Sequence, residues 1–240
     1  MDLCLADYGY IKENLATVRG RLQAAAEAAG HPTPRLIAVT KSATDDEVRA
    51  LLAFGIDAIA ENRPQLFTAR AALIDEACAP TEIHLIGHLQ TNKVKSVVER
   101  AALIQSLDSD RLAAEIERQA AKREITVRVL IEVNSGREEA KGGLLPEEVE
   151  AFAESLSAYP HLLPVGLMTM GPDCENPEEY RPYFRLVREL AGGLAARGLL
   201  PSCPVLSMGM SGSYEVAASM GATHVRVGRT LFHKPQETNE

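Results

Sequence analysis

Short apolar runs and longer amphipathic stretches alternate along most of this chain. Eight of the runs are rich in Val, Ile, Leu and Ala, which is typical of strands buried on both faces of a parallel sheet. They span residues 36–40, 56–60, 83–86, 103–107, 127–133, 165–168, 205–207 and 224–227. The pattern therefore predicts eight strands.

The stretches between these runs are long enough to form helices. They include residues 45–54, 64–77, 110–123, 146–157 and 177–197. A further helix over 8–29 is predicted before the first strand, because Ile11, Leu15, Val18 and Leu22 recur at three- and four-residue spacing.

Two of the helix starts carry capping signals. Thr44 and Glu47 form a capping-box pattern directly after the first strand. Asn176, Pro177 and Glu179 supply a cap, a proline at the first helical position and a carboxylate at the third. We therefore expect helices to begin at 45 and at 177.

Strands that alternate with helices favour a parallel α/β fold. Eight such units in 240 residues fit a single (β/α)8 TIM-type barrel domain over residues 1–240, with the first helix as an N-terminal addition. An open, doubly wound sheet is the alternative, because periodicity does not reveal closure. No low-complexity segment or linker divides the chain, and residues 236–240 are expected to be a frayed tail.

Composition narrows the functional classes. A net charge of -8 and a pI near 5.4 argue against nucleic-acid binding. The four cysteines are scattered and form no CxxC pair, which argues against a zinc site or a disulfide framework and fits a reducing compartment. The chain shows no secretory leader and no apolar run of about 18 residues, so we expect a cytoplasmic protein without membrane binding.

Lys41 is the first candidate for chemistry, because it closes the apolar run LIAVTK and precedes the first capping signal. In a parallel barrel, ligands bind at the edge where the strands end. An amine held there in a partly desolvated pocket has a lowered pKa and can attack a carbonyl to form a Schiff base. The alternative is a solvated loop lysine, which describes most lysines.

The loops after the seventh and eighth predicted strands indicate a phosphate site. They read SMGMSGS at 207–213 and RVGRT at 226–230. Barrels often bind phosphate between these two loops, where glycine lets backbone N–H groups approach closely. Ser211 is expected to cap the following helix and to direct its positive end at the anion. The alternative is that these glycines only form tight turns.

A strand-end lysine and a phosphate site on one rim together suit pyridoxal 5'-phosphate, which carries an aldehyde and a phosphate. Arg226 ends the eighth strand and is expected to face the pyridine nitrogen. A guanidinium only donates, so it would keep that nitrogen unprotonated and weaken the ring as an electron sink. The alternative for Arg226 is a salt bridge to Glu61.

Two other polar features have simpler interpretations. His84 is expected in a strand and His88 beyond its end, so no metal site is predicted, and His88 would line the cofactor pocket or hydrogen-bond a loop backbone. The segment 136–143, with Glu138, Glu139 and Lys141, is expected to be a solvated loop rather than a lid.

Eight segments that run along the whole predicted barrel carry a family resemblance. They read AVTK at 38–41, AENR at 60–63, IHLIGHLQTNK at 83–93, SLDS at 106–109, VLIEVNSGREEAKGG at 129–143, VGLMTM at 165–170, LSMGMSGSYEVAASMGATHVRVG at 206–228 and LF at 231–232. Together they resemble the YggS/PROSC family of pyridoxal phosphate homeostasis proteins, which is similar to the barrel domain of alanine racemase. The resemblance implies a fold-type III pyridoxal-phosphate barrel with the Schiff base on Lys41.

The resemblance also assigns the other cofactor contacts. It implies that Arg226 lies by the pyridine nitrogen, that Ser207, Gly209 and Gly228 belong to the phosphate-binding loops, and that Asn62 and His88 line the pocket. The chain departs from the family pattern at Arg229, where threonine or serine is usual, and at Ala60 and Gly212-Ser213. Backbone N–H groups and the Arg229 guanidinium are expected to replace the missing hydroxyl at the phosphate.

The function implied by the resemblance is to hold pyridoxal phosphate, to buffer its aldehyde and to hand it transiently to apo-enzymes, without substantial catalysis. Alanine racemase also needs a tyrosine from an additional C-terminal domain, which is expected to be absent because the chain ends at Glu240, while Tyr214 lies at a helix start. A low-activity amino-acid racemase is the alternative, and a sugar-phosphate barrel enzyme with a substrate Schiff base is a third hypothesis. We expect a monomer, with a dimer as the alternative.

Overall fold

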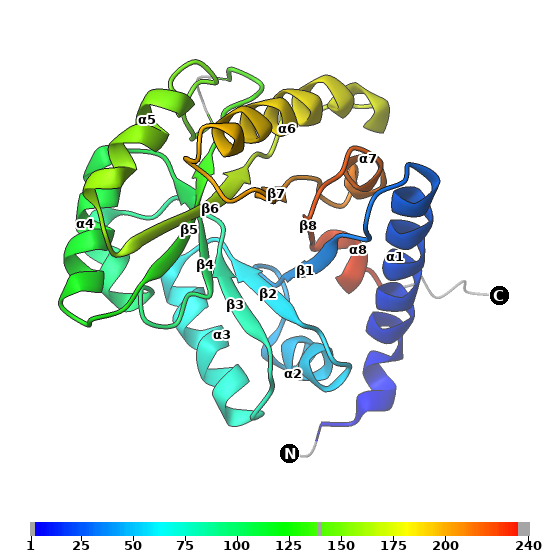
Figure 1. Ribbon diagram of the computed structural model, residues 1–240. Helices are drawn as coiled ribbons and strands as arrows, with labels where there is room; N and C mark the ends of the chain where they lie inside the picture. Colours follow the sequence, from blue (N-terminus) through cyan, green and yellow to red (C-terminus); the bar gives the residue numbers. More distant parts are fainter. Residues whose placement is uncertain (1–2, 139–140, 235–240) are drawn as a thin grey trace.

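The eight strands close into a parallel barrel (Figure 1). The computed structural model describes residues 3–138 and 141–234, so the tail expected at 236–240 lies outside the described residues. The strands are β1 (Arg35–Val39), β2 (Ala58–Glu61), β3 (Glu82–Leu85), β4 (Leu103–Leu107), β5 (Val127–Glu132), β6 (Leu162–Met168), β7 (Val205–Ser207) and β8 (His224–Val227). β8 pairs with β1 and completes the circle. The predicted barrel is confirmed, and the open-sheet alternative is wrong.

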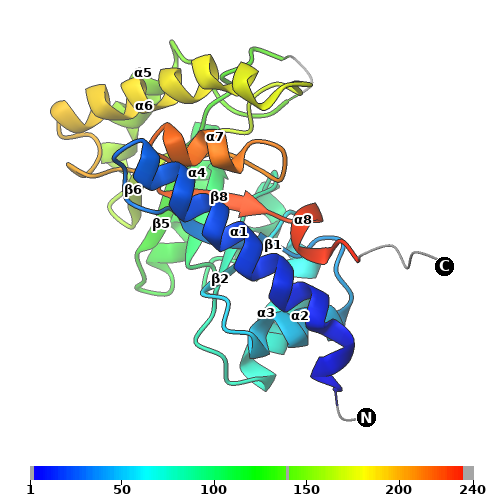
Figure 2. The same cartoon turned by 90° about the vertical axis from the view of Figure 1, so that its right-hand side faces the viewer.

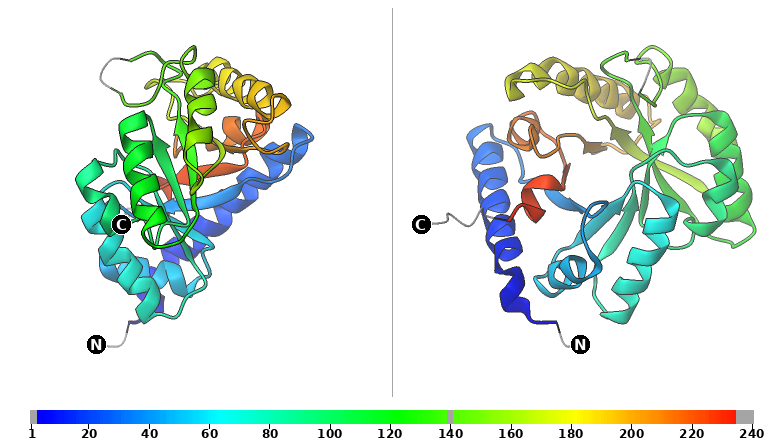
Figure 3. Two further views of the ribbon diagram at one scale, coloured as in Figure 1. Left: turned by 60° about the vertical axis from the view of Figure 1, so that its left-hand side comes forward. Right: turned by 180° about the vertical axis from the view of Figure 1, so that it is seen from behind.

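Helices surround the barrel on its outside (Figures 1 and 3). They are α2 (Asp45–Ala53), α3 (Pro64–Glu76), α4 (Asp110–Ala121), α5 (Val149–Ser155), α6 (Arg181–Ala196), α7 (Tyr214–Ser219) and α8 (Arg229–Phe232). Short 3-10 helices are η1 (Leu5–Tyr8), η2 (Thr91–Ser96), η3 (Leu156–Ala158) and η4 (Pro177–Tyr180). Within the described ranges, no helix is long and apolar enough to cross a membrane.

The predicted N-terminal helix is confirmed as α1 (Gly9–Ala28). It runs along the outside of the barrel and contacts α7 and α8 (Figure 2). Its buried face contains Ile11, Leu15, Val18 and Leu22, the residues whose spacing predicted the helix. The apolar face of α1 therefore covers the side of the barrel where β8 pairs with β1.

Strand pairing moves several predicted boundaries. β2 begins at Ala58 rather than at 56, because its pairing with β3 starts there and its pairing with β1 starts one residue later. β6 begins at Leu162 rather than at 165, because Leu162 pairs with Val127 at the start of β5. The helix expected at 146–157 is α5 followed by η3, and that expected at 177–197 is η4 followed by α6.

The predicted capping signals can be compared with the observed hydrogen bonds. Thr44 and Glu47 form the expected capping box, and Asn176 accepts a hydrogen bond from the Glu178 N–H at 3.0 Å. The expected cap at Ser211 is wrong, because α7 begins only after Ser213. The Ser211 hydroxyl instead accepts a hydrogen bond from the Gly228 N–H at 3.4 Å, which links the loops after β7 and β8.

The interior of the barrel combines apolar and polar side chains. Two apolar clusters contain Ile37, Val39, Ala58 and Ala60, and Leu103, Leu130, Val165 and Met168. The buried polar residues of β3, β4, β7 and β8 include His84, Gln105, Ser207 and Arg226. Ser207 reaches Gln105 across the barrel, from β7 to β4. Because alternate residues of a strand point to opposite faces, single polar residues can mark the inward positions of an otherwise apolar run.

Candidate functional site

Lys41 lies in a tight turn at the carboxyl end of β1. The Ala43 N–H donates to the Thr40 carbonyl at 3.0 Å, which closes the turn around Lys41 and Ser42. Thr40 is fully buried, whereas Lys41 is exposed. The predicted strand-end position is therefore confirmed, but the expected partial desolvation is not found, because the structure does not bury this residue.

Arg226 is a buried cation on β8. It is 3% exposed, its Nη1 donates to Ser207 Oγ at 2.7 Å, and its Nη2 donates to the Thr169 carbonyl at 2.8 Å. Burial lowers the pKa of Arg226 to about 10, and the Glu132 carboxylate opposes that shift. The guanidinium therefore stays charged at neutral pH. The alternative salt bridge to Glu61 is wrong, because Glu61 contacts Thr40 and Arg70 instead.

A column of hydrogen bonds continues from Arg226 into the barrel. Ser207 Oγ donates to Gln105 Oε1 at 2.7 Å, and Gln105 Nε2 donates to His84 Nδ1 at 3.0 Å. Because an amide nitrogen only donates, His84 must carry its proton on Nε2, which faces Glu82 Oε2 at 3.2 Å. Burial lowers the pKa of His84, so the ring is neutral. The column thus fixes the orientation of every polar group between Arg226 and Glu82.

Gln105 and Thr169 were missed among the predicted site residues. Gln105 is a polar residue in the middle of the apolar run LIQSL, and this is the signal that could have identified it. Thr169 contributes a backbone carbonyl, which no sequence pattern reveals. Ser207 was expected in the phosphate-binding loops, and its hydroxyl is engaged by Gln105 and Arg226. Its role in binding the cofactor stays a prediction.

Gly209 and Gly228 shape the two loops that are expected to bind phosphate. Gly209 has a φ of +91°, and a Cβ there would lie 2.4 Å from Ala217 Cβ in α7. A Cβ on Gly228 would lie 3.0 Å from the Val39 carbonyl of β1. The first position therefore requires glycine, and the second leaves little room for a side chain.

These loops present several hydrogen-bond donors. Within the described residues, the N–H groups of Gly209, Ser211 and Gly212 donate to no protein acceptor. Arg229 begins α8 directly after Gly228, and its side chain is exposed. Free N–H groups and a guanidinium are the donors that proteins commonly use to bind anions.

Asn62 and His88 lie past the ends of β2 and β3. The carbonyl oxygen of Asn62 lies only 2.1 Å from the position of a Cβ on Gly87, so the two chain segments cross in direct contact. The exposed His88 ring has its Nδ1 3.6 Å from Asp108 Oδ2. Residues 3–138 and 141–234 contain no group of three or more His, Cys, Asp or Glu side chains arranged to hold a metal ion.

The chain as a whole is similar in sequence to a known group of proteins. Residues 13–235 match the family described as alanine racemase, N-terminal domain. The pyridoxal phosphate homeostasis protein of Aquifex aeolicus is 42% identical over 222 residues, which cover 92% of this chain and 96% of that protein. The chain belongs to the pyridoxal phosphate homeostasis protein family.

Solved structures resemble this family member over nearly its whole length. The crystal structure of a protein from Bifidobacterium adolescentis has a TM-score of 0.88 at 36% identity and covers 95% of this chain and 96% of its own. PipY of Synechococcus elongatus, in a structure with PLP bound, has a TM-score of 0.81 at 30% identity, with 93% and 100% covered. The described barrel is therefore the architecture of these related proteins as well.

In this member of the family, the described part of the segment 136–143 is a loop of exposed and half-buried residues, as expected, and it is also tied to the neighbouring chain by hydrogen bonds. Asn134 Nδ2 donates to the Glu138 carbonyl at 2.9 Å, and Lys141 Nζ donates to the Gly171 carbonyl at 3.0 Å. The Leu144 N–H donates to the Glu132 carbonyl at 2.8 Å. Glu139, which was part of that expectation, lies outside the described residues.

Glu132 is a buried carboxyl close to this segment. It is 6% exposed, and one of its oxygens and Asp108 Oδ2 each lie 3.8 Å from the position of a Cβ on Gly142. Burial, and then the Asp108 charge, raise the pKa of Glu132 to about 7, while Arg226 opposes the shift. The barrel therefore has a carboxyl with a pKa near neutrality at the end of the apolar run of β5, a position that the sequence analysis did not single out.

Proposed function

We propose that this protein binds pyridoxal 5'-phosphate as a Schiff base on Lys41 and serves the intracellular homeostasis of that cofactor, without substantial catalysis. One observation carries the proposal. β8 and β1 are neighbours in the closed barrel, so Lys41 and the loop of Gly228 follow adjacent strand ends. An amine beside anion-binding loops suits a ligand that has both an aldehyde and a phosphate. The names of the relatives and the PLP-bound PipY structure support the same ligand.

The donors on this rim fit the cofactor chemically. The Lys41 amine would add to the aldehyde carbon and, with loss of one water, form a C=N bond. When bound, the cofactor supplies an electron-withdrawing ring. The phosphate would be held by the free N–H groups of the loops and by the Arg229 guanidinium, and Asn62 and His88 would border the ring.

Arg226 and Tyr214 support a binding role over a catalytic one. Arg226 is fixed by Ser207 and Thr169, and a donor-only group at the pyridine nitrogen weakens the ring as an electron sink. Tyr214 is 4% exposed in α7, which packs against α1 on the outside of the barrel. Tyr214 is therefore poorly placed to be the second acid or base that a racemase needs.

The first test is the visible spectrum of the purified protein before and after borohydride reduction, followed by peptide mass mapping. We expect a band that borohydride removes and a phosphopyridoxyl mass on Lys41. Lys41→Ala should lose both signals, whereas Lys12→Ala, which removes an exposed lysine of α1, should keep both.

Three outcomes separate the competing functions. A colourless protein that gains no band when pyridoxal phosphate is added would contradict the proposal and favour a sugar-phosphate enzyme. Turnover of free amino acids by the loaded protein would favour the racemase. Recovery of activity by an added apo-enzyme, together with loss of the band, would support transfer of the cofactor.

A further inference from the structure

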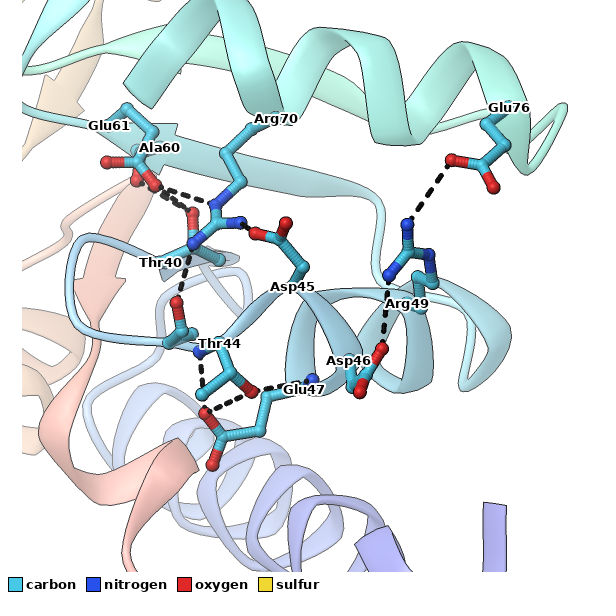
Figure 4. Close-up of polar contacts among 11 residues, drawn as sticks. Thr40, Thr44, Asp45, Asp46, Glu47, Arg49, Ala60, Glu61, Arg70 and Glu76 are labelled. Carbon is cyan, nitrogen blue, oxygen red and sulfur yellow. Dashed lines mark hydrogen bonds and ion pairs between the residues drawn. The ribbon is translucent and has the colours of Figure 1, made fainter. Parts of the chain in front are cut away.

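The turn that carries Lys41 is anchored at both ends by one buried ion pair (Figure 4). At its start, Thr40 Oγ1 donates to Glu61 Oε1 at 2.6 Å. At its end, Arg70 Nη2 donates to the Ala43 carbonyl at 2.5 Å. Arg70 Nε lies 3.4 Å from the same Glu61 Oε1, so the two anchors form one connected unit.

This ion pair joins three elements around the turn. Glu61 ends β2 and is fully buried, while Arg70 comes from α3 and is 4% exposed. Arg70 also donates to Asp45, the first residue of α2. Buried charges are costly unless they stay paired, so neither side chain is free to move away from the other. The backbone on both sides of Lys41 is therefore held to rigid parts of the barrel.

We propose that Arg70 and Glu61 are positioning residues for Lys41, which present its amine to the aldehyde in one geometry. The inference rests on the proposed function. Lys41 is exposed, and its side chain has four rotatable bonds, so few contacts with the rest of the protein fix its conformation. The direction in which the amine extends therefore depends on the position of the Lys41 backbone. A fixed turn confines the amine to the neighbourhood of the adjacent loops, and reactions are sensitive to such placement.

The chain offers a matched control on the same two helices. Arg49 of α2 donates to Asp46 at 3.0 Å and to Glu76 of α3 at 3.4 Å, so it links α2 to α3 as Arg70 does (Figure 4). Its bonds do not involve the turn at 40–43, and its side chain is 36% exposed. Removing Arg49 therefore tests the link between the helices without touching the anchors of Lys41.

The experiment compares Arg70→Met with Arg49→Met in two separate measurements. The first is the rate at which free pyridoxal, which has no phosphate, forms a Schiff base on Lys41. The second is the affinity for inorganic phosphate, which depends on the loops after β7 and β8. We expect Arg70→Met to slow the first by about tenfold or more, as for a misplaced reacting group, and to leave the second unchanged. A general loss of structure would weaken both, and Arg49→Met should change neither.

If Arg70→Met does not fold, the variant Asp45→Asn and the rate of amide hydrogen exchange at Ala43 test the inference instead. Asp45→Asn weakens only the exposed part of the unit, since this side chain is 65% exposed, and should slow the same reaction by a smaller factor. Amide hydrogen exchange at Ala43 should become faster in both variants. Unchanged reaction rates in the folded variants would overturn the inference, whatever the exchange rate at Ala43. If the wild-type protein forms no adduct on Lys41, the proposed function fails, whereas an adduct that forms equally fast in all variants defeats only the positioning role.

Discussion

At the scale of single residues, the buried polar groups inside the barrel are held in place by hydrogen bonds to one another. Gln105 is fully buried and uses both ends of its amide, one for Ser207 and one for His84. Arg226 depends on the same column, because Ser207 accepts its Nη1 donor. Buried polar groups that lose their partners cost more than the hydrogen bond itself contributed.

Gln105→Met keeps the length of this side chain but removes both hydrogen bonds. It should lower the free energy of unfolding by about 2–5 kcal/mol, because it leaves two buried polar groups unpaired. Urea denaturation measures this change. Gln23→Met, on the exposed face of α1, is the control and should change the value by less than about 0.5 kcal/mol. Equal midpoints for the two variants would mean that the column contributes nothing to stability.

At the scale of elements, the conformation of the connection from β7 to α7 requires glycine at position 209 but not at position 212. Gly209 combines a φ of +91° with a Cβ position 2.4 Å from Ala217, whereas a Cβ on Gly212 would meet nothing within 4 Å. The two positions belong to the same loop, so they form a matched pair of sites. A substitution at the first must move either the loop or α7.

Gly209→Ala should destabilise the protein by about 1–3 kcal/mol through backbone strain alone, and it should weaken binding of inorganic phosphate. Gly212→Ala keeps the backbone N–H, and its added Cβ would meet nothing within 4 Å, so it should leave both properties unchanged. Thermal unfolding and phosphate titration measure the two effects. If both variants bind phosphate like the wild-type protein, the loop after β7 does not form the anion site.

At the scale of the whole molecule, two titratable groups, the half-buried His224 and the buried Glu132, make stability depend on pH in opposite directions. His224 has a pKa lowered to about 3, by burial first and then by His84, so stability is lost as the pH falls below the unfolded value of 6.5. Glu132 has a pKa raised to about 7 from 4.5, so its folded form binds more protons than its unfolded form in that window. Glu132 therefore costs stability as the pH rises from about 4.5 to 7.

Glu132→Gln should remove this second dependence. The variant should be more stable than the wild-type protein at pH 8, and the difference should shrink toward pH 5, by about 3 kcal/mol at most. Denaturant unfolding of both proteins at pH 5, 6, 7 and 8 measures it. A difference that does not vary with pH would mean that Glu132 titrates with an ordinary pKa.

Much of the fold, and the strand-end positions of two candidate site residues, followed from local sequence patterns. Apolar runs predicted the eight strands, the spacing of Ile11, Leu15, Val18 and Leu22 predicted α1, and the capping box at Thr44 placed α2 directly after Lys41. Lys41 and Arg226 were recognisable because each is a lone cation at the end of an apolar run. Such signals depend on residues within a few positions of each other, and the backbone responds to them locally.

The partners of these residues depended on closure of the barrel, which sequence periodicity does not report. Arg226 was expected to have Glu61 as its alternative partner, yet it donates to Ser207 and Thr169, while Glu61 is paired with Arg70. Likewise, Ser211 bonds to the next loop instead of capping α7. The hydrogen bonds of Arg226 and Ser211 join residues 17 to 57 positions apart, and a buried polar group bonds to whichever partner the packed strands bring within reach. The chain's local patterns therefore predicted the strand ends at which Lys41 and Arg226 lie, and the closed barrel decided which groups contact Arg226 and Glu61.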